Sequence, residues 1–152
     1  MLIKITKKNN RNTLVCTRED GTFTKSELGP KLPFHDMAHY VMEKKFNIQG
    51  GFYGMIAKGY SVEQLSDKNI IKTLGEESWL SEILARALGS LHTRACSKEQ
   101  FIPLIQEELS GKYTIPMPAI TEETVSEILD EYRALIERWN ALPNGGSVKL
   151  QF

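Results

Sequence analysis

The chain has 152 residues, and its 19 basic and 19 acidic side chains give a formal net charge of zero. A chain of this length fits one domain over residues 1–152, able to bury about two-thirds of its unfolded surface. A neutral chain has no overall field to attract a polyanion, and no segment approaches the roughly 18 apolar residues of a membrane span. We therefore expect neither nucleic acid nor membrane as a partner, and we leave a homo-oligomer open.

The first 27 residues predict a β-meander. Residues 2–6, 13–17 and 22–25 are rich in β-branched side chains. Polar residues 8–12 and the Asp20-Gly21 dipeptide supply the turns between them.

A further strand is predicted at the other end of the chain. Residues 147–152 alternate polar and apolar, which places Val148, Leu150 and Phe152 on one face of a sheet. One strand cannot be stable alone, so we expect it to join the meander in a single antiparallel sheet.

Between the strands, periodic apolar residues predict about five helices. Pro33 suits the first turn of the first helix, and capping patterns at Ser61, Ser97 and Thr121 mark the starts of three others. Apolar residues also recur at helical spacing over residues 79–91 and 125–139. Because no strand–helix alternation is visible, the expected class is α+β, with the helices packed on the antiparallel sheet.

The cysteines and the first residues bear on location. Cys16 and Cys96 are far apart and form no Cys-x-x-Cys pair, which is typical of free thiols in a reducing compartment. Residues 1–8 lack the apolar run of a signal peptide. Both observations predict a cytoplasmic location.

One segment carries candidate chemistry, His35-Asp36-Met37-Ala38-His39. Histidines four apart lie one helical turn apart, with Cβ atoms about 5–6 Å distant, so their imidazoles can converge on one cation. Glu43 continues the same row and is the expected third ligand, ahead of His92. Asp36 would orient a water or a partner, and a fourth position would stay open on a divalent metal such as zinc.

This segment resembles the His-Glu-x-x-His helix of zinc metallopeptidases, with Asp36 in place of the general-base glutamate. Aspartate is one methylene shorter, so the resemblance does not extend to peptidase chemistry. The His35-Asp36 dipeptide also resembles that of HD-domain phosphohydrolases, which are all-helical and use a histidine upstream. No histidine precedes residue 35 here.

A longer resemblance is to small uncharacterised bacterial proteins. They share a Leu-Pro-x-His-Asp-x-x-His-Tyr segment, here residues 32–40, and a Gly-Phe-aromatic-Gly segment, here residues 51–54. The similarity extends to the long C-terminal helix and its exit at residues 139–143. It implies a family but no activity.

Three functions are compatible with the histidine pair. As a metal site it would make the protein a hydrolase, if the protein is an enzyme. Without a metal the histidines could act as general acid and base. In a non-enzymatic binding or assembly module, the helix face from His35 to Phe46 would meet another chain, and the histidines would be structural.

Overall fold

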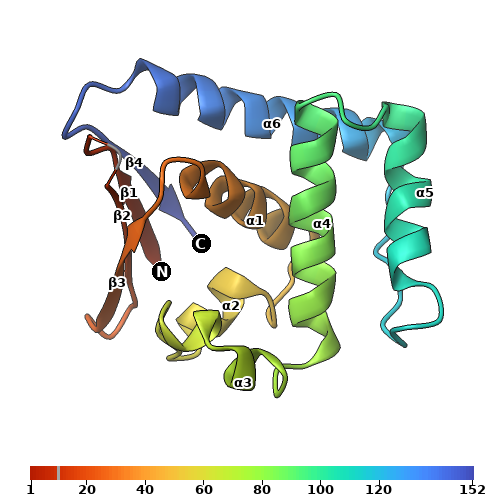
Figure 1. The fold of residues 1–152 in the computed structure, drawn as a ribbon, viewed down its shortest axis with the longest axis horizontal. Helices are drawn as coiled ribbons and strands as arrows, with labels where there is room; N and C mark the ends of the chain where they lie inside the picture. The colour runs from red at the N-terminus through yellow and green to blue at the C-terminus, as the bar shows by residue number, and fades with distance from the viewer. Residues whose placement is uncertain (10) are drawn as a thin grey trace.

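The computed structural model describes residues 1–9 and 11–152, and it confirms the α+β class. Four strands form one antiparallel sheet in the order β3-β2-β1-β4 (Figure 1). The strands are β1 (Leu2–Thr6), β2 (Asn12–Thr17), β3 (Phe23–Leu28) and β4 (Ser147–Gln151). Residue 10, in the predicted turn at 8–12, lies outside the described residues.

The C-terminal strand pairs with β1, as predicted. Ile3 lies opposite Leu150 and Ile5 opposite Val148, so their side chains share the buried face of the sheet. The N-terminal amine donates a hydrogen bond of 2.7 Å to the carbonyl of Phe152, beside the last residue of the sheet. The two ends of the described chain are therefore neighbours.

Six α-helices follow the strands of the meander within residues 29–146. They are α1 (Leu32–Phe46), α2 (Phe52–Ala57), α3 (Lys68–Ile71), α4 (Glu76–His92), α5 (Lys98–Leu109) and α6 (Glu122–Ala141). Thr121 caps α6 and Ser97 forms a capping box on α5, which confirms both predicted starts. Ser61 instead begins a single 3-10 turn, η1 (Gln64–Ser66), because Asp67 caps the next helix almost at once.

The helices lie in successive layers rather than all on the sheet. Figure 1 shows α1 beside the sheet, α4 beyond it and α5 outermost, while α6 runs along the edge of these layers. Helix α1 packs against both α4 and α6. As a result, the face of α1 turned away from the sheet meets α4, and residues of these two helices build the site described below.

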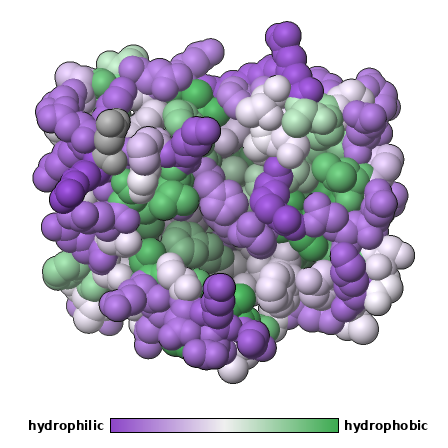
Figure 2. Space-filling view, in the orientation of Figure 1, coloured by the Kyte–Doolittle hydropathy of each residue, from purple (hydrophilic) through white to green (hydrophobic). Residues whose placement is uncertain are grey.

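The surface is mainly polar, with apolar recesses. On the face drawn in Figure 2, hydrophobic residues are visible in hollows between hydrophilic ones. Among the described residues, no helix combines the length and apolarity that crossing a membrane requires.

Candidate metal centre

Helices α1 and α4 bring three ligand-type atoms together. The Nε2 atoms of His35 and His39, one turn apart on α1, are separated by 3.2 Å. From α4, Oε2 of Glu82 lies 3.4 Å from Nε2 of His35 and 3.3 Å from Nε2 of His39. These residues are the group of three identified as able to hold a metal ion within residues 1–9 and 11–152.

The triangle of atoms has the dimensions of a zinc site. In tetrahedral zinc coordination with metal–ligand distances of about 2.0–2.1 Å, neighbouring ligand atoms lie about 3.3–3.4 Å apart. The observed separations of 3.2, 3.3 and 3.4 Å match these edges. Octahedral magnesium, at about 2.0–2.1 Å, would require edges of about 2.9–3.0 Å.

The other nitrogen of His39 is fixed by buried acceptors. Its Nδ1 lies 3.1 Å from Oε1 of Glu43 and 2.9 Å from Oγ of Ser81. Ser81 donates its own proton to Glu43 at 2.7 Å, so it can only accept from the imidazole. Nδ1 therefore carries the proton, and in the neutral ring the Nε2 lone pair points toward His35 and Glu82.

That arrangement needs a hydrogen-bond donor or a cation at the centre of the triangle. A bare lone pair 3.3 Å from a carboxylate oxygen is repulsive, and either a proton or a metal ion removes the repulsion. Burial alone would lower the pKa of His39, but hydrogen bonds to Glu43 and Glu82 outweigh it and raise the pKa to about 9. Hydrogen bonds from His35 and His39 likewise hold the pKa of Glu82 well below its usual range.

Glu43 faces Nδ1 of His39 rather than the triangle. Besides Ser81 and His39, its carboxylate accepts backbone N–H bonds from Tyr53 at 2.9 Å and Gly54 at 3.1 Å, at the start of α2. The carboxylate of Glu43 thus has four hydrogen-bond partners, although the side chain is fully buried. The predicted third ligand thus orients His39, and Glu82 is the carboxylate that completes the triangle.

Two glycines at the start of α2 make this contact feasible. A Cβ atom on Gly51 would lie 2.6 Å from Oε1 and 2.8 Å from Oε2 of Glu43, and one on Gly54 would collide with the backbone of Gln49. The backbone at Gly51 therefore approaches a buried carboxylate too closely for a residue with a side chain.

We expect Gly51→Ala to lower the free energy of unfolding by about 1–3 kcal/mol, because the carboxylate of Glu43, held by four partners, cannot move away from a new methyl group. Gly89→Ala is the matched control, since a Cβ there, in the last turn of α4, meets nothing within 4 Å. It should stabilise the protein by about 0.5–1 kcal/mol. Urea unfolding measures both, and equal shifts in the two variants would contradict the packing argument.

Asp36 lies away from the triangle. The residue is only 6% exposed, and its Oδ2 makes no hydrogen bond to any described residue. Burial raises the pKa of Asp36 to about 6, although the charges of His39 and His35 act to lower it. This position suits an electrostatic influence on the histidines better than the contact with a water or a partner expected from the sequence.

We expect Asp36→Asn to stabilise the metal-free protein at neutral pH. A carboxyl group whose pKa is higher in the folded state contributes most stability below its unfolded value, and loses it as the pH rises through about 6. From pH 4 to pH 8 the variant should therefore gain about 2.5 kcal/mol relative to the wild type, at about 1.4 kcal/mol per pKa unit. Urea unfolding across this range measures the gain, and a difference independent of pH would contradict it.

The remaining histidine, His92, ends α4 and does not belong to the triangle. Its ring makes an edge contact with Tyr132, with centroids 5.3 Å apart. It is therefore not a fourth ligand in this arrangement, and it supplies a control for metal binding.

Two hollows flank the triangle. The first, which we call the apolar hollow, has a volume of about 390 Å³ and reaches His39 and Glu82. Its lining comprises His39, Gly51, Phe52, Met55, Leu65, Ile71, Leu74, Ser78, Trp79, Glu82 and Arg86. The second hollow, of about 740 Å³, reaches His35 and shares Arg86 with the first. A cation in the triangle would therefore border open space.

No family model, curated protein or solved structure matches this chain. The resemblance to small bacterial proteins therefore stays a prediction. The function of the protein is therefore inferred below from the geometry of the site alone.

Proposed function

We propose that His35, His39 and Glu82 bind one zinc ion, and that the site catalyses hydrolysis of an ester or amide bond. The observation that carries the proposal is the triangle of ligand atoms, whose separations of 3.2–3.4 Å lie within about 0.1 Å of the edges of tetrahedral zinc coordination. The fixed tautomer of His39 supports it, because metal-binding histidines commonly donate their other N–H to a carboxylate.

The ligand set also narrows the choice of metal ion. Magnesium and calcium prefer ligands that are all oxygen, whereas two imidazoles and one carboxylate suit zinc or iron(II). Octahedral iron(II), the usual ion of a facial triad of two histidines and one carboxylate, places neighbouring ligands at about 90°, whereas the separations of 3.2–3.4 Å lie nearer the tetrahedral edge. Zinc is therefore the metal we propose.

Three protein ligands with open space beside them favour a catalytic centre. Structural zinc sites are closed by four protein ligands, while catalytic ones keep a position for water or substrate. When bound, zinc would polarise a carbonyl and lower the pKa of a bound water to about 7. Arg86, whose Nε lies 3.6 Å from Oε1 of Glu82, pairs with the carboxylate oxygen that is not part of the triangle and helps to fix its orientation.

The burial of His39 weighs against the assembly hypothesis. The residue is only 5% exposed, and both of its ring nitrogens contact side chains of the same chain. A histidine in this position cannot form hydrogen bonds across an interface with a second chain.

Hydrolysis can be tested on the full chain after removal and return of zinc. p-Nitrophenyl acetate reports the reaction directly, since water adds to the carbonyl carbon, the C–O bond breaks, and acetate and p-nitrophenol are released. We expect one equivalent of zinc to raise the rate at least about tenfold over the metal-free protein.

The matched variants are Glu82→Gln and Glu108→Gln, because both glutamates contact Arg86 but only Glu82 belongs to the triangle. Glu82→Gln should lose the zinc-dependent rate, and Glu108→Gln should keep it. Equal rates in the metal-free protein, the zinc-loaded protein and the Glu82 variant would overturn the proposal.

A further inference from the structure

We propose that the apolar hollow holds the hydrophobic acyl group of the substrate, so that the site acts on esters or amides of hydrophobic carboxylic acids. This inference rests on the proposed function, because it places the reactive carbonyl at the metal. The hollow lies between α2, the η1–α3 segment and α4, and one end of it is formed by His39 and Glu82.

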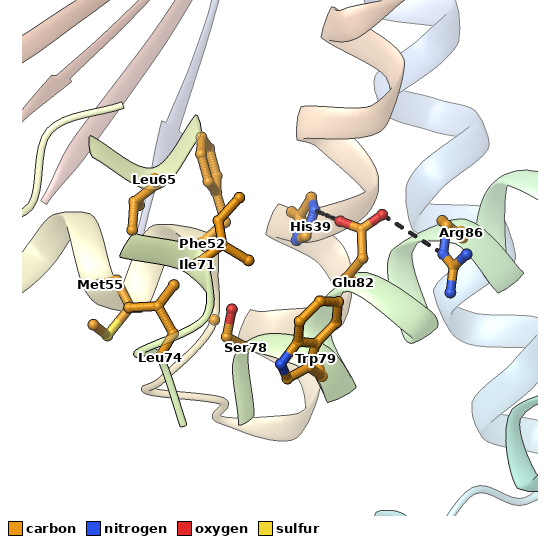
Figure 3. A pocket seen from close by; sticks show the side chains of 11 residues that line it. His39, Phe52, Met55, Leu65, Ile71, Leu74, Ser78, Trp79, Glu82 and Arg86 are labelled. Carbon is orange, nitrogen blue, oxygen red and sulfur yellow. Dashed lines mark ion pairs between the residues drawn. The ribbon is translucent and has the colours of Figure 1, made fainter. Parts of the chain in front are cut away.

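The polarity of the hollow changes from one end to the other. In Figure 3, Glu82 points toward His39 at one end, and Arg86 lies on the far side of Glu82. The other end is formed by apolar side chains, namely Phe52, Met55, Leu65, Ile71 and Leu74. A ligand that satisfies both ends has a polar head at the triangle and an apolar tail directed away from it.

The aromatic residues show how the two ends meet. The ring of Phe52 packs on that of His39, with centroids 5.5 Å apart, and so forms the boundary between the imidazole and the apolar end. Trp79 also lines the hollow, yet it remains 37% exposed and stacks with Tyr113 at 6.2 Å. Trp79 begins the row of apolar residues at 79–91, and its partial exposure at the hollow fits a surface that a ligand covers.

The size of the hollow fits a small ligand. Its volume of about 390 Å³ lies within the range of about 300–1,000 Å³ typical of small-molecule pockets, which are mostly apolar with a few placed polar groups. The second hollow is also lined by apolar side chains, but of the three residues of the triangle it borders only His35. The first hollow borders both His39 and Glu82, so it is better placed to take the tail of a ligand whose polar head lies at the triangle.

Two hydroxamic acids test the inference, since each carries the same zinc-binding head. Acetohydroxamic acid has a single methyl group, and octanohydroxamic acid has a seven-carbon tail. Titration calorimetry on the zinc-loaded full chain should show octanohydroxamic acid binding at least about 100-fold more tightly, because each buried methylene adds several-fold to affinity.

Leu74→Trp fills the apolar end without touching the triangle. It should lower the affinity for octanohydroxamic acid at least about tenfold and leave that for acetohydroxamic acid unchanged, which also shows that the variant is folded and binds zinc. Leu2→Trp is the control, since Leu2 is an exposed leucine of β1 outside the hollow. It should change neither affinity.

The outcomes separate the two proposals. If zinc increases the affinity for neither hydroxamic acid, the proposed function fails and this inference with it. If the zinc-loaded protein binds both equally well, or Leu74→Trp leaves the octanohydroxamic acid affinity unchanged, only the assignment of the hollow is overturned.

Discussion

Replacing His39 by alanine is expected to lower the affinity for zinc by on the order of 1,000-fold. We expect the wild type to bind one zinc ion per chain and the variant to bind none stoichiometrically. Loss of an outer partner of a metal ligand costs about 10–100-fold, and loss of the ligand itself should cost more. His39 also joins the triangle to Glu43 and Ser81, so its removal leaves His35 and Glu82 without the orienting network.

His35→Ala and Glu82→Gln should give losses of similar size, since each removes one corner of the triangle. His92→Ala is the control, because this histidine lies outside the group. Titration with zinc in the presence of a competing chelator measures all four proteins. Retained stoichiometric zinc in His39→Ala, or equal loss in His92→Ala, would contradict the assignment of ligands.

Replacing Glu43 by alanine should lower the free energy of unfolding by about 3–5 kcal/mol. The substitution leaves the N–H groups of Tyr53 and Gly54 and the hydroxyl of Ser81 buried without their acceptor. It also leaves a cavity at a position that is fully buried. Urea unfolding of the metal-free proteins measures the loss.

The control for this substitution is Glu127→Ala. Glu127 is exposed and forms a surface ion pair with Lys45, so its removal should cost no more than about 1 kcal/mol. A comparable loss in both variants would mean that Glu43 contributes no more to stability than a glutamate in a surface ion pair.

Glu43→Gln separates the effect on the metal from the effect on the fold. The amide oxygen can still accept from the backbone of α2, but its NH₂ would then face Nδ1 of His39 and favour the tautomer with the proton on Nε2. That proton blocks the ligand position, so zinc affinity should fall about 10–100-fold. Unchanged affinity in a folded Glu43→Gln variant would contradict an orienting action of Glu43.

Local patterns in the sequence predict much of the fold. The β-branched segments, the Asp20-Gly21 turn and the caps at Ser97 and Thr121 depend on neighbours in sequence, and the structure contains all of them. The capping pattern at Ser61 is equally local, but no apolar stripe follows it. The chain there forms only a 3-10 turn and the short helix α3.

The sequence predicts only part of the candidate site, because only part of it depends on residues that are neighbours in sequence. His35 and His39 are neighbours on one helix, so their spacing alone reveals the pair. Glu82 joins them through the packing of α4 on α1, and nothing in the sequence around it specifies which residue of α1 it meets. Its place beside the apolar stripe of α4, in a row with Ser78 and Arg86, is the one signal that could have suggested it.

The position of Glu43 depends on tertiary contacts as well. Its spacing from His39 places it in the same row, which suggested a third ligand. The backbone at the start of α2 and the hydroxyl of Ser81 supply three hydrogen-bond donors to the carboxylate. These donors hold it beside Nδ1 of His39 and away from the Nε2 atoms of the triangle. Gly51 permits that approach, and its contribution becomes visible only when the two segments are seen together.

Anomalous diffraction at the zinc edge from a crystal of the zinc-loaded protein tests whether His35, His39 and Glu82 hold the metal. We expect one strong peak about 2.0–2.1 Å from Nε2 of His35, Nε2 of His39 and Oε2 of Glu82. A peak on other residues, or a fully zinc-loaded crystal without a peak between α1 and α4, would contradict it.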